Sequence, residues 1–268
     1  MTKAALIILA LRTVVSAAHL TQAADREFGV YVANLEGRLV EQHKNPKTHV
    51  ATLNLAGNRT AVERQLTSGD LRIEPVGKLD LPGALLHHWR GAAFVANATA
   101  AEMVALLRDY DHLSKFYAPE ITASRAVKDD GETAILAVRL KERRVRTIVL
   151  DAEYRVEATL AGRDRGYSSS RSTRIWQVDN AWTPHERRRT PGDDEGFLWR
   201  LNSYWSFERG PGGLWIECEA VSLTRDVPMG LGWLITPIIQ ELPSDALQFT
   251  LRATRNALLA IAAGKGQP

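Results

Sequence analysis

The sequence lacks most of the features that mark a specialised class of protein. Among its 268 residues there is one cysteine, Cys218, so no disulfide can form within the chain. Beyond the first residues, no apolar run approaches the ~20 residues that a membrane-spanning helix needs. Aromatic residues make up 7% and charged residues 24% of the chain, which is ordinary for a globular protein.

The chain also lacks a strong excess of charge. It has 34 Lys and Arg residues against 31 Asp and Glu residues, a net charge of +3. Loss of Lys3 and Arg12 with an N-terminal leader would lower this value from +3 to +1. Because binding to phosphate backbones in general requires a strong basic field, we expect no nucleic-acid partner.

Motifs that carry chemistry are absent as well. The sequence has no phosphate-binding loop, no dinucleotide fingerprint and no serine nucleophile elbow. Its histidines show no metal-ligand spacing, and a metal site needs three or four converging ligands. We therefore predict no catalytic residue, no metal and no cofactor.

The first 24 residues are typical of a signal peptide. Lys3 is followed by an apolar stretch, and the small residues of "SAA" and "QAA" offer sites for a peptidase near Ala23 or Ala24. Arg12 interrupts the apolar stretch, and an ordinary amphipathic helix is the alternative. Export to the periplasm or the medium is expected, or a cytoplasmic location if this segment is not a signal.

Residues 25–79 form a predicted N-terminal extension. Apolar residues recur at helical spacing in 28–46, namely at Phe28, Tyr31, Val32, Leu35 and Leu39. A loop, a short helix at 60–66 and a short strand at 71–76 follow. Residues 80–264 then form the main predicted domain.

The main domain is predicted to contain a strand, two short helices, six further strands and a long helix, in this order. Thr99 and Glu102 form a capping box at the start of the first helix. Short turns join the strands, which indicates an antiparallel meander. Ser244 is the expected cap of the last helix, whose apolar stripe includes Leu247, Leu251 and Leu258. The predicted fold is α+β, with a curved seven-stranded antiparallel sheet around the C-terminal helix.

Two segments of the sequence resemble the START/polyketide-cyclase superfamily, also called the SRPBCC or helix-grip fold. They are "ATAAEMVALLRDYDHLSKFYAPEI" and "YWSFERGPGGLWIECEAVSLTRDVPMGLGWLITPII" with the helix that follows. The resemblance covers about residues 80–262 and implies a cavity for a hydrophobic ligand between the sheet and the last helix. The superfamily includes carriers and cyclases, so the fold alone does not name an activity.

The hairpin that contains Cys218 has a register that the side chains can indicate. A four-residue loop at 209–212 sets Phe207 opposite Leu214 and Trp205 opposite Ile216, which sorts apolar from polar side chains. Cys218 then lies on an apolar face under the long helix, where burial makes it inert. Glu217 and Glu219 point outward.

Strand parity also suggests which side chains line the cavity. His87 and His88 point to opposite faces, and the sequence does not show which of them enters the cavity. The predicted ligand-binding residues are His88, Trp89, Phe116, Tyr154, Trp176, Trp199, Trp205, Ile216 and Trp233.

The favoured function is binding or transport of a hydrophobic small molecule or lipid. The segment 228–239 is either core packing or a gate that allows transient membrane contact, and the charged segments 141–146 and 185–195 are either solvated loops or a rim of the cavity. One alternative is a cyclase or aromatase that acts on a polyketide-like substrate. The other is a protein-interaction module with a filled cavity. The ligand and the oligomeric state are not indicated.

Overall fold

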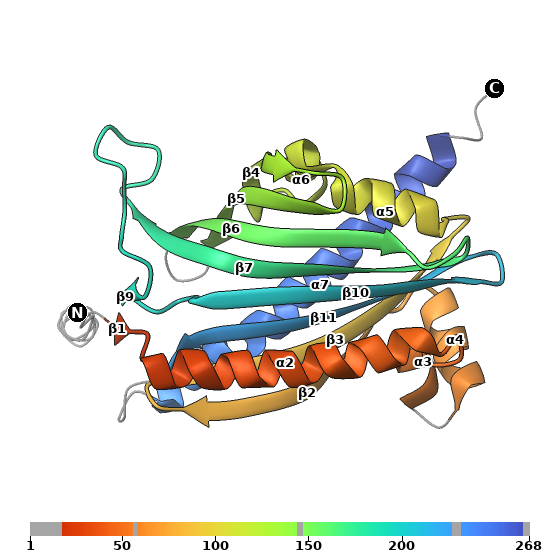
Figure 1. Cartoon of the computed structure of the whole chain (residues 1–268), viewed down its shortest axis with the longest axis horizontal. Coiled ribbons are helices and arrows are strands. Elements are labelled where there is room, and N and C mark those ends of the chain that lie inside the picture. The colour runs from red at the N-terminus through yellow and green to blue at the C-terminus, as the bar shows by residue number, and fades with distance from the viewer. Residues whose placement is uncertain (1–17, 56–57, 144–146, 227–231, 265–268) are drawn as a thin grey trace, which may run out of the picture.

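A large antiparallel sheet lies between helices on both of its faces. The computed structural model describes residues 18–55, 58–143, 147–226 and 232–264. Helix α2 (Gln22–Lys44) crosses in front of the sheet in Figure 1, and helix α7 (Gly232–Gly264) crosses behind it. We call the face covered by α7 the inner face and the face covered by α2 the outer face.

Eight strands follow one another across the sheet, each antiparallel to its neighbour. Their order is β2 (Arg72–Leu81), β3 (Ala84–Ala96), β11 (Gly213–Arg225), β10 (Arg200–Gly210), β7 (Arg165–Asp179), β6 (Thr147–Leu160), β5 (Thr133–Arg143) and β4 (Ile121–Asp129). A ninth strand, β8 (Arg187–Arg188), pairs with β7. The predicted α+β fold is thus confirmed with two additional strands, and one of them, β2, begins in the predicted extension.

Helix α2 forms because its sequence provides both a cap and an apolar stripe. The Thr21 side chain accepts a hydrogen bond from the Ala24 amide, which satisfies a donor of the first turn. Phe28, Leu35 and Leu39 are buried against the outer face, as their spacing predicts. The sequence predicted this helix but not that it would cover the sheet.

The predicted leader falls partly on described residues. Residues 1–17 lie outside them, β1 (Ala18–His19) pairs with β9 (Asp193–Asp194), and residues 22–24 begin α2. Removal of the leader remains a prediction.

Short helices add to both faces of the sheet. Helices α3 (Thr52–Leu55) and α4 (Arg59–Thr67) cover the outer face around Trp215. On the inner face, α5 (Ala100–Arg108) begins with the predicted capping box of Thr99 and Glu102. The η1 turn (Tyr110–His112) and α6 (Leu113–Phe116) follow, which confirms the second short helical segment.

Helix α7 is longer than the sequence indicated. It begins at Gly232 and continues through Pro243, so the predicted cap at Ser244 is wrong. A proline removes one hydrogen bond of a helix, and packing against the sheet can compensate for this loss. The predicted stripe is confirmed, because Leu247, Leu251 and Leu258 are buried against the sheet.

Gly91 allows α7 to lie close to β3. A Cβ atom at this position would approach Leu251 Cδ1 to 2.5 Å and Leu247 Cδ2 to 3.3 Å. Real Cβ atoms essentially never show the first of these contacts, so a side chain here would force Leu251 to shift. The absence of a side chain at Gly91 therefore sets the depth at which the helix packs.

The β10–β11 hairpin corrects the predicted register. Its turn has two residues, with Gly210 opposite Gly213, so Trp205 lies opposite Cys218 and Phe207 opposite Ile216. The difference is a shift of two positions, which leaves every side chain on its predicted face. Alternation alone cannot distinguish registers that differ by two, whereas the positive φ of Gly212 (76°) suits the tight Pro-Gly turn.

We expect the substitution Gly91→Val to lower the melting temperature strongly, because the new side chain collides with two buried leucines of α7. Overpacking of this kind costs roughly 1–3 kcal/mol. The matched control is Ala123→Val on the exposed part of β4, which should change the melting temperature little. Equal effects of the two substitutions in thermal unfolding would contradict the role given to Gly91.

Candidate functional site

The inner face carries two apolar clusters that meet beneath α7. One joins Trp205, Phe207 and Ile216 of the sheet to Leu247, Leu251 and Leu258 of α7. The other surrounds Tyr154 on β6 and includes side chains of β5 and of the η1–α6 segment. Phe116 packs against both clusters and so connects them.

Five of the predicted ligand-binding residues lie on this inner face. Trp205 and Ile216 are buried within the first cluster, and Trp89 packs against it. Tyr154 belongs to the second cluster, and Phe116 contacts both. Strand parity was sufficient for Trp89, Trp205 and Ile216 because no irregularity interrupts the pairing of β3, β11 and β10.

Three other predicted residues lie on the outer face. His88 bonds Tyr31 of α2, and Trp199 packs beside Phe28 because it precedes β10, where strand alternation does not yet apply. Trp176 stacks with Arg188 because a β-bulge in the β6–β7 pairing reverses the parity of β7. These three do not line the space between the sheet and α7.

The last predicted residue, Trp233, has a side chain outside the described residues. The same holds for most of the segment 228–239, so its role as core or gate remains a prediction. Of the charged segment 141–146, residues 144–146 also lie outside the described part of the chain.

A row of polar and apolar side chains crosses the inner face at the level of His87. Cross-strand pairing sets His87 opposite Ser222, Ser222 opposite Leu201, and Ser172 opposite Tyr154. The Leu201 amide donates to Ser172 Oγ at 3.0 Å, which joins the two halves of the row. Of the two adjacent histidines, His87 is therefore the one that faces inward.

Both ends of this row favour an uncharged state. Desolvation by burial lowers the pKa of His87, with a further contribution from Lys78. Burial raises the pKa of Tyr154 well above its ordinary value. A molecule against this row thus meets neutral hydrogen-bonding groups rather than charges.

Cys218 is enclosed on the inner face, as predicted. It lies in the cluster under α7, and burial followed by the charges of Glu219 and Glu217 raises the pKa of its thiol. Burial also raises the pKa of nearby Tyr117 to about 12, although Thr254 bonds its hydroxyl at 2.8 Å. Both groups keep their protons at neutral pH, so neither is a nucleophile.

We expect Cys218 to resist thiol reagents in the native protein, because the reactive thiolate is suppressed and the sulfur is covered. Reaction with Ellman's reagent should be slow without denaturant and should reach one thiol per chain in guanidinium chloride. Rapid labelling of the folded protein would show that Cys218 is open and ionised.

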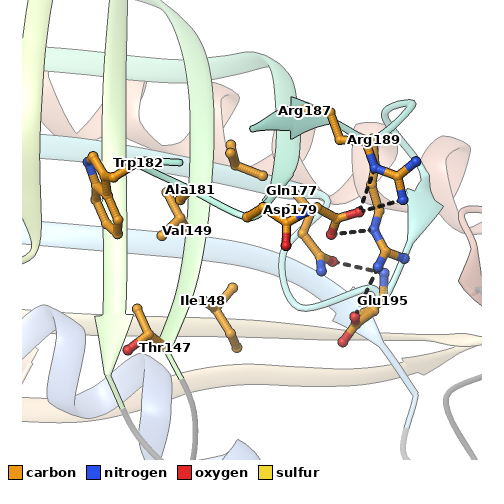
Figure 2. Close-up of a pocket in the computed structure, with 12 residues that line it drawn as sticks. Thr147, Ile148, Val149, Gln177, Asp179, Ala181, Trp182, Arg187, Arg189 and Glu195 are labelled. Carbon is orange, nitrogen blue, oxygen red and sulfur yellow. Dashed lines mark hydrogen bonds and ion pairs between the residues drawn. The ribbon is translucent and has the colours of Figure 1, made fainter. Parts of the chain in front are cut away.

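A pocket of about 560 Å³ opens where β6 begins and β7 ends, as Figure 2 shows. Both polar and apolar side chains line it, and one of the apolar ones, Ile148, also packs against the inner-face cluster around Tyr154. The residues that line the pocket are Thr147, Ile148, Val149, Gln177, Val178, Asp179, Asn180, Ala181, Trp182, Arg187, Arg189 and Glu195. The sequence had suggested part of this rim through the charged segment 185–195.

Ion pairs hold the polar rim of the pocket. Arg187 and Arg189 both pair with Asp179, at 3.2 and 2.9 Å, and Arg189 also pairs with Glu195 at 3.3 Å. The charges of these four side chains balance, so the rim has no strong preference for an anion. Trp182 is 55% exposed at the edge, held by a backbone with a φ of 61°. Such a backbone is unusual for a bulky residue and turns the indole outward.

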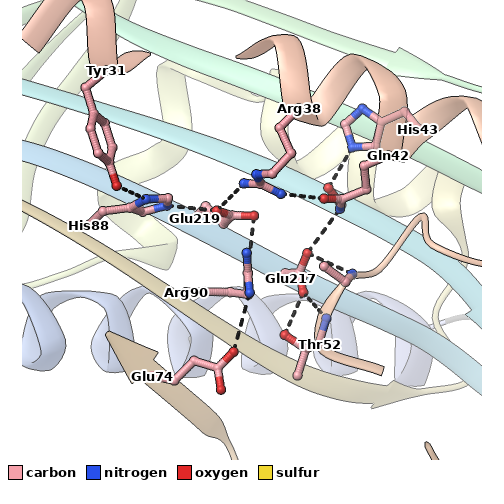
Figure 3. A network of polar contacts seen from close by, with 12 residues as sticks. Tyr31, Arg38, Gln42, His43, Thr52, Glu74, His88, Arg90, Glu217 and Glu219 are labelled. Carbon is pink, nitrogen blue, oxygen red and sulfur yellow. Dashed lines mark hydrogen bonds and ion pairs between the residues drawn. The ribbon is translucent and has the colours of Figure 1, made fainter. Parts of the chain in front are cut away.

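The outer face carries a buried ionic network under α2, shown in Figure 3. Glu219, whose side chain is 1% exposed, pairs with Arg38 of α2 at 2.6 Å and with Arg90 of β3 at 3.2 Å. His88 Nε2 lies 2.8 Å from the same carboxylate and must donate, because an ionised carboxylate only accepts. On the other side of the ring, His88 Nδ1 lies 2.9 Å from the Tyr31 hydroxyl.

Glu217 anchors the segment that follows α2. Its carboxylate accepts hydrogen bonds from the Thr52 amide and hydroxyl, both at 2.6 Å, and from the Ala51 amide at 3.1 Å. Gln42 Nε2 approaches it at 3.4 Å. The side chain is thus satisfied by donors from the extension.

The expectation that Glu217 and Glu219 point outward is correct for their face but wrong for their environment. They are buried under the extension rather than exposed to solvent. A signal for this existed in the sequence, since Arg38 and Gln42 follow Leu35 and Leu39 on a helix that needed a partner. No local pattern, however, indicated that the partner was the "ECE" strand.

Because of this network, we expect the free energy of unfolding to fall at acid pH. Burial opposes ionisation of Glu219, but the hydrogen bond from His88 and the charges of Arg90 and Arg38 outweigh it and lower the pKa of Glu219 to about 2. A carboxyl whose folded pKa is depressed contributes stability above its unfolded pKa of about 4.5 and loses it as pH falls toward 2.

We therefore expect Glu219→Gln to destabilise the protein by roughly 3–5 kcal/mol at pH 7, as removal of one partner of a buried ion pair does. The substitution should also flatten the loss of stability between about pH 4.5 and pH 2. Chemical unfolding across that range measures both. Glu41→Gln, in an exposed pair with Lys44, is the control and should have an effect below about 1 kcal/mol. A similar acid profile for both variants would exclude this assignment.

Among the described residues, no group of three or more His, Cys, Asp or Glu side chains is placed to hold a metal ion. In the same part of the chain, no helix has the length and hydrophobicity to span a membrane.

The architecture defines a class of fold. A curved, open antiparallel sheet around a long C-terminal helix is the architecture that the sequence resemblance predicted. The extension with its edge strand β2 and covering helix α2 is added to that core.

Solved structures include several of similar architecture. A STAR-related lipid transfer protein from Xanthomonas axonopodis is 19% identical, with a TM-score of 0.43, over 69% of this chain and 98% of that one. A START superfamily protein from Mycobacterium smegmatis is 12% identical, with a TM-score of 0.42, over 65% and 98%. The Zhui aromatase/cyclase from Streptomyces sp. R1128 is 11% identical, with a TM-score of 0.45, over 68% and 96%.

At these identities and TM-scores the similarity concerns the fold and carries no information about ligand or activity. No protein-family model and no curated protein matches the chain.

Proposed function

We propose that this protein binds a hydrophobic small molecule or lipid, without chemical conversion, between the inner face and α7. The pocket at the ends of β6 and β7 is its entrance. The observation that carries the proposal is the position of Ile148, which belongs both to the wall of this pocket and to the apolar cluster of the inner face.

The dimensions of the pocket suit an entrance for such a ligand. Its volume of about 560 Å³ lies within the range of small-molecule sites, roughly 300–1,000 Å³. An apolar ligand that buries ~200 Å² of surface would gain about 5 kcal/mol before the costs of association. The ion-paired rim would favour a polar but uncharged group at the entrance.

The chemistry of the inner face supports binding over catalysis. General acid–base catalysis needs groups that exchange protons near the working pH. Tyr117, Tyr154 and Cys218 hold their protons at neutral pH because burial raises each pKa. These three side chains therefore give a cyclase mechanism no support, so it would have to rely on the inward-facing His87, whose pKa is lowered by burial.

The rim of the pocket also suits brief contact with a membrane. Trp182 is exposed there, and Lys141 Nζ lies 5.3 Å from the centre of its ring. An exposed indole beside a cation fits the boundary between lipid headgroups and acyl chains. Export through the leader at 1–24 is part of the same proposal and would place the protein in the periplasm or outside the cell.

The test is native mass spectrometry with solvent extraction on protein purified from its own host. We expect a copurified apolar molecule that Ile148→Trp reduces at least fivefold, because the indole fills the pocket wall where the ligand must pass. Leu160→Trp, at the exposed opposite end of the same strand, is the matched control and should retain the ligand. Protein that carries no small molecule and takes up none from lipid vesicles would refute the proposal and favour an interaction module.

A further inference from the structure

His87 is the one inward-facing histidine of β3, and its surroundings leave it incompletely bonded. Its side chain lies on the inner face, between Lys78 of β2 and Ser222 of β11, the residues that pair with it. It is 3% exposed, and its buried Nε2 has no hydrogen-bond partner among the residues that the structure describes. Trp89, two residues along the strand, lies on the same face in the apolar cluster.

A buried nitrogen without a partner is costly. Leaving such a group unsatisfied costs roughly 1–3 kcal/mol, and folded proteins retain few of them. His88, its neighbour on the opposite face, shows the contrast, because both of its ring nitrogens are bonded, to Tyr31 and to Glu219. The fold thus satisfies one histidine of the pair completely and leaves a free nitrogen on the side where the ligand is proposed to bind.

We propose that His87 Nε2 is the anchor that hydrogen-bonds an oxygen atom of the bound ligand, and that the ligand is an apolar molecule with a neutral hydroxyl or carbonyl group. This inference rests on the proposed binding function. It names the residue that selects the ligand and the chemical group that is selected.

A neutral oxygen fits the site better than a charged group does. Burial favours the uncharged imidazole, which offers either a donor or an acceptor at Nε2 according to its tautomer. The ionisable neighbours, Lys78 and Asp80, carry opposite charges and are both exposed on the edge strand, so their fields largely cancel. The Ser222 hydroxyl opposite His87 provides a second neutral group beside the anchor.

The remainder of the row accommodates an apolar body. From His87 the inner face continues through Ser222 and Leu201 to Ser172 and Tyr154. Neighbouring strands lie about 4.8 Å apart, so this row is roughly 19 Å long. Its far end lies on β6, the strand that also provides Ile148 of the pocket.

The experiment compares dodecanol with tridecane, which have the same number of heavy atoms and differ in the hydroxyl group. Dissociation constants are measured by native mass spectrometry for the wild type, His87→Phe and His87→Gln. In His87→Phe we expect the affinity for dodecanol relative to tridecane to fall about tenfold, the value of one buried hydrogen bond. His87→Gln retains an amide that can bond the hydroxyl and should recover part of this preference.

Stability provides a readout that separates this role from a structural one. The melting temperature of ligand-free His87→Phe should equal or exceed that of the wild type, because the substitution removes an unsatisfied nitrogen. His88→Phe, the adjacent control, should lower the melting temperature because it leaves buried Glu219 short of a donor.

The outcomes distinguish the two proposals. An unchanged dodecanol-to-tridecane ratio in both His87 variants, with both probes still bound, refutes the anchor and leaves the binding function intact. Failure of the wild type to bind either probe, or any lipid from vesicles, refutes both.

Discussion

The pairing of β3 with β11 at the centre of the sheet is the constraint on which the rest of the structure depends. Cys218 lies opposite Gly91 and Glu219 opposite Arg90, so one register sets both faces at once. On the inner face it places a glycine and a small thiol beneath α7, which lets the helix approach closely. On the outer face it places a carboxylate beside an arginine. Neither face could be altered independently, because alternate side chains of the same two strands form both.

Ion pairs hold the covering layer of the outer face, which is formed by α2 and the segment after it. Burial of Glu219 would be prohibitive without partners, and β3 supplies only His88 and Arg90. Arg38 of α2 completes the site and at the same time ties the extension to the sheet. Glu217 does the same for residues 51 and 52. The extension is therefore a structural part of this protein, and its removal would expose a row of carboxylates and apolar side chains.

The inner face has the opposite character. Neutral polar side chains lie among its apolar ones, and some are bonded within the fold, as Tyr117 is to Thr254. His87 Nε2 is one of the buried atoms that have no partner among the described residues, and the proposed ligand would satisfy it. The charged side chains are thus paired with one another on the outer face, whereas neutral groups lie on the inner face. This separation explains how a sheet rich in ionisable residues can still provide an apolar binding surface.

The sequence by itself determined the elements and the faces of the unbroken strands. Helical spacing located α2 and the stripe of α7, a capping box located α5, and alternation placed Trp205, Ile216 and Cys218 correctly, because each signal acts over a few residues. Only the tertiary structure decided what lies against those faces. A bulge moved Trp176, a tight turn shifted the hairpin by two positions, and α2 buried the carboxylates of "ECE". The bulge and the tight turn are irregularities that strict alternation does not record. The burial of the carboxylates, and the β3–β11 pairing that decides which histidine faces inward, depend on contacts between residues more than a hundred positions apart.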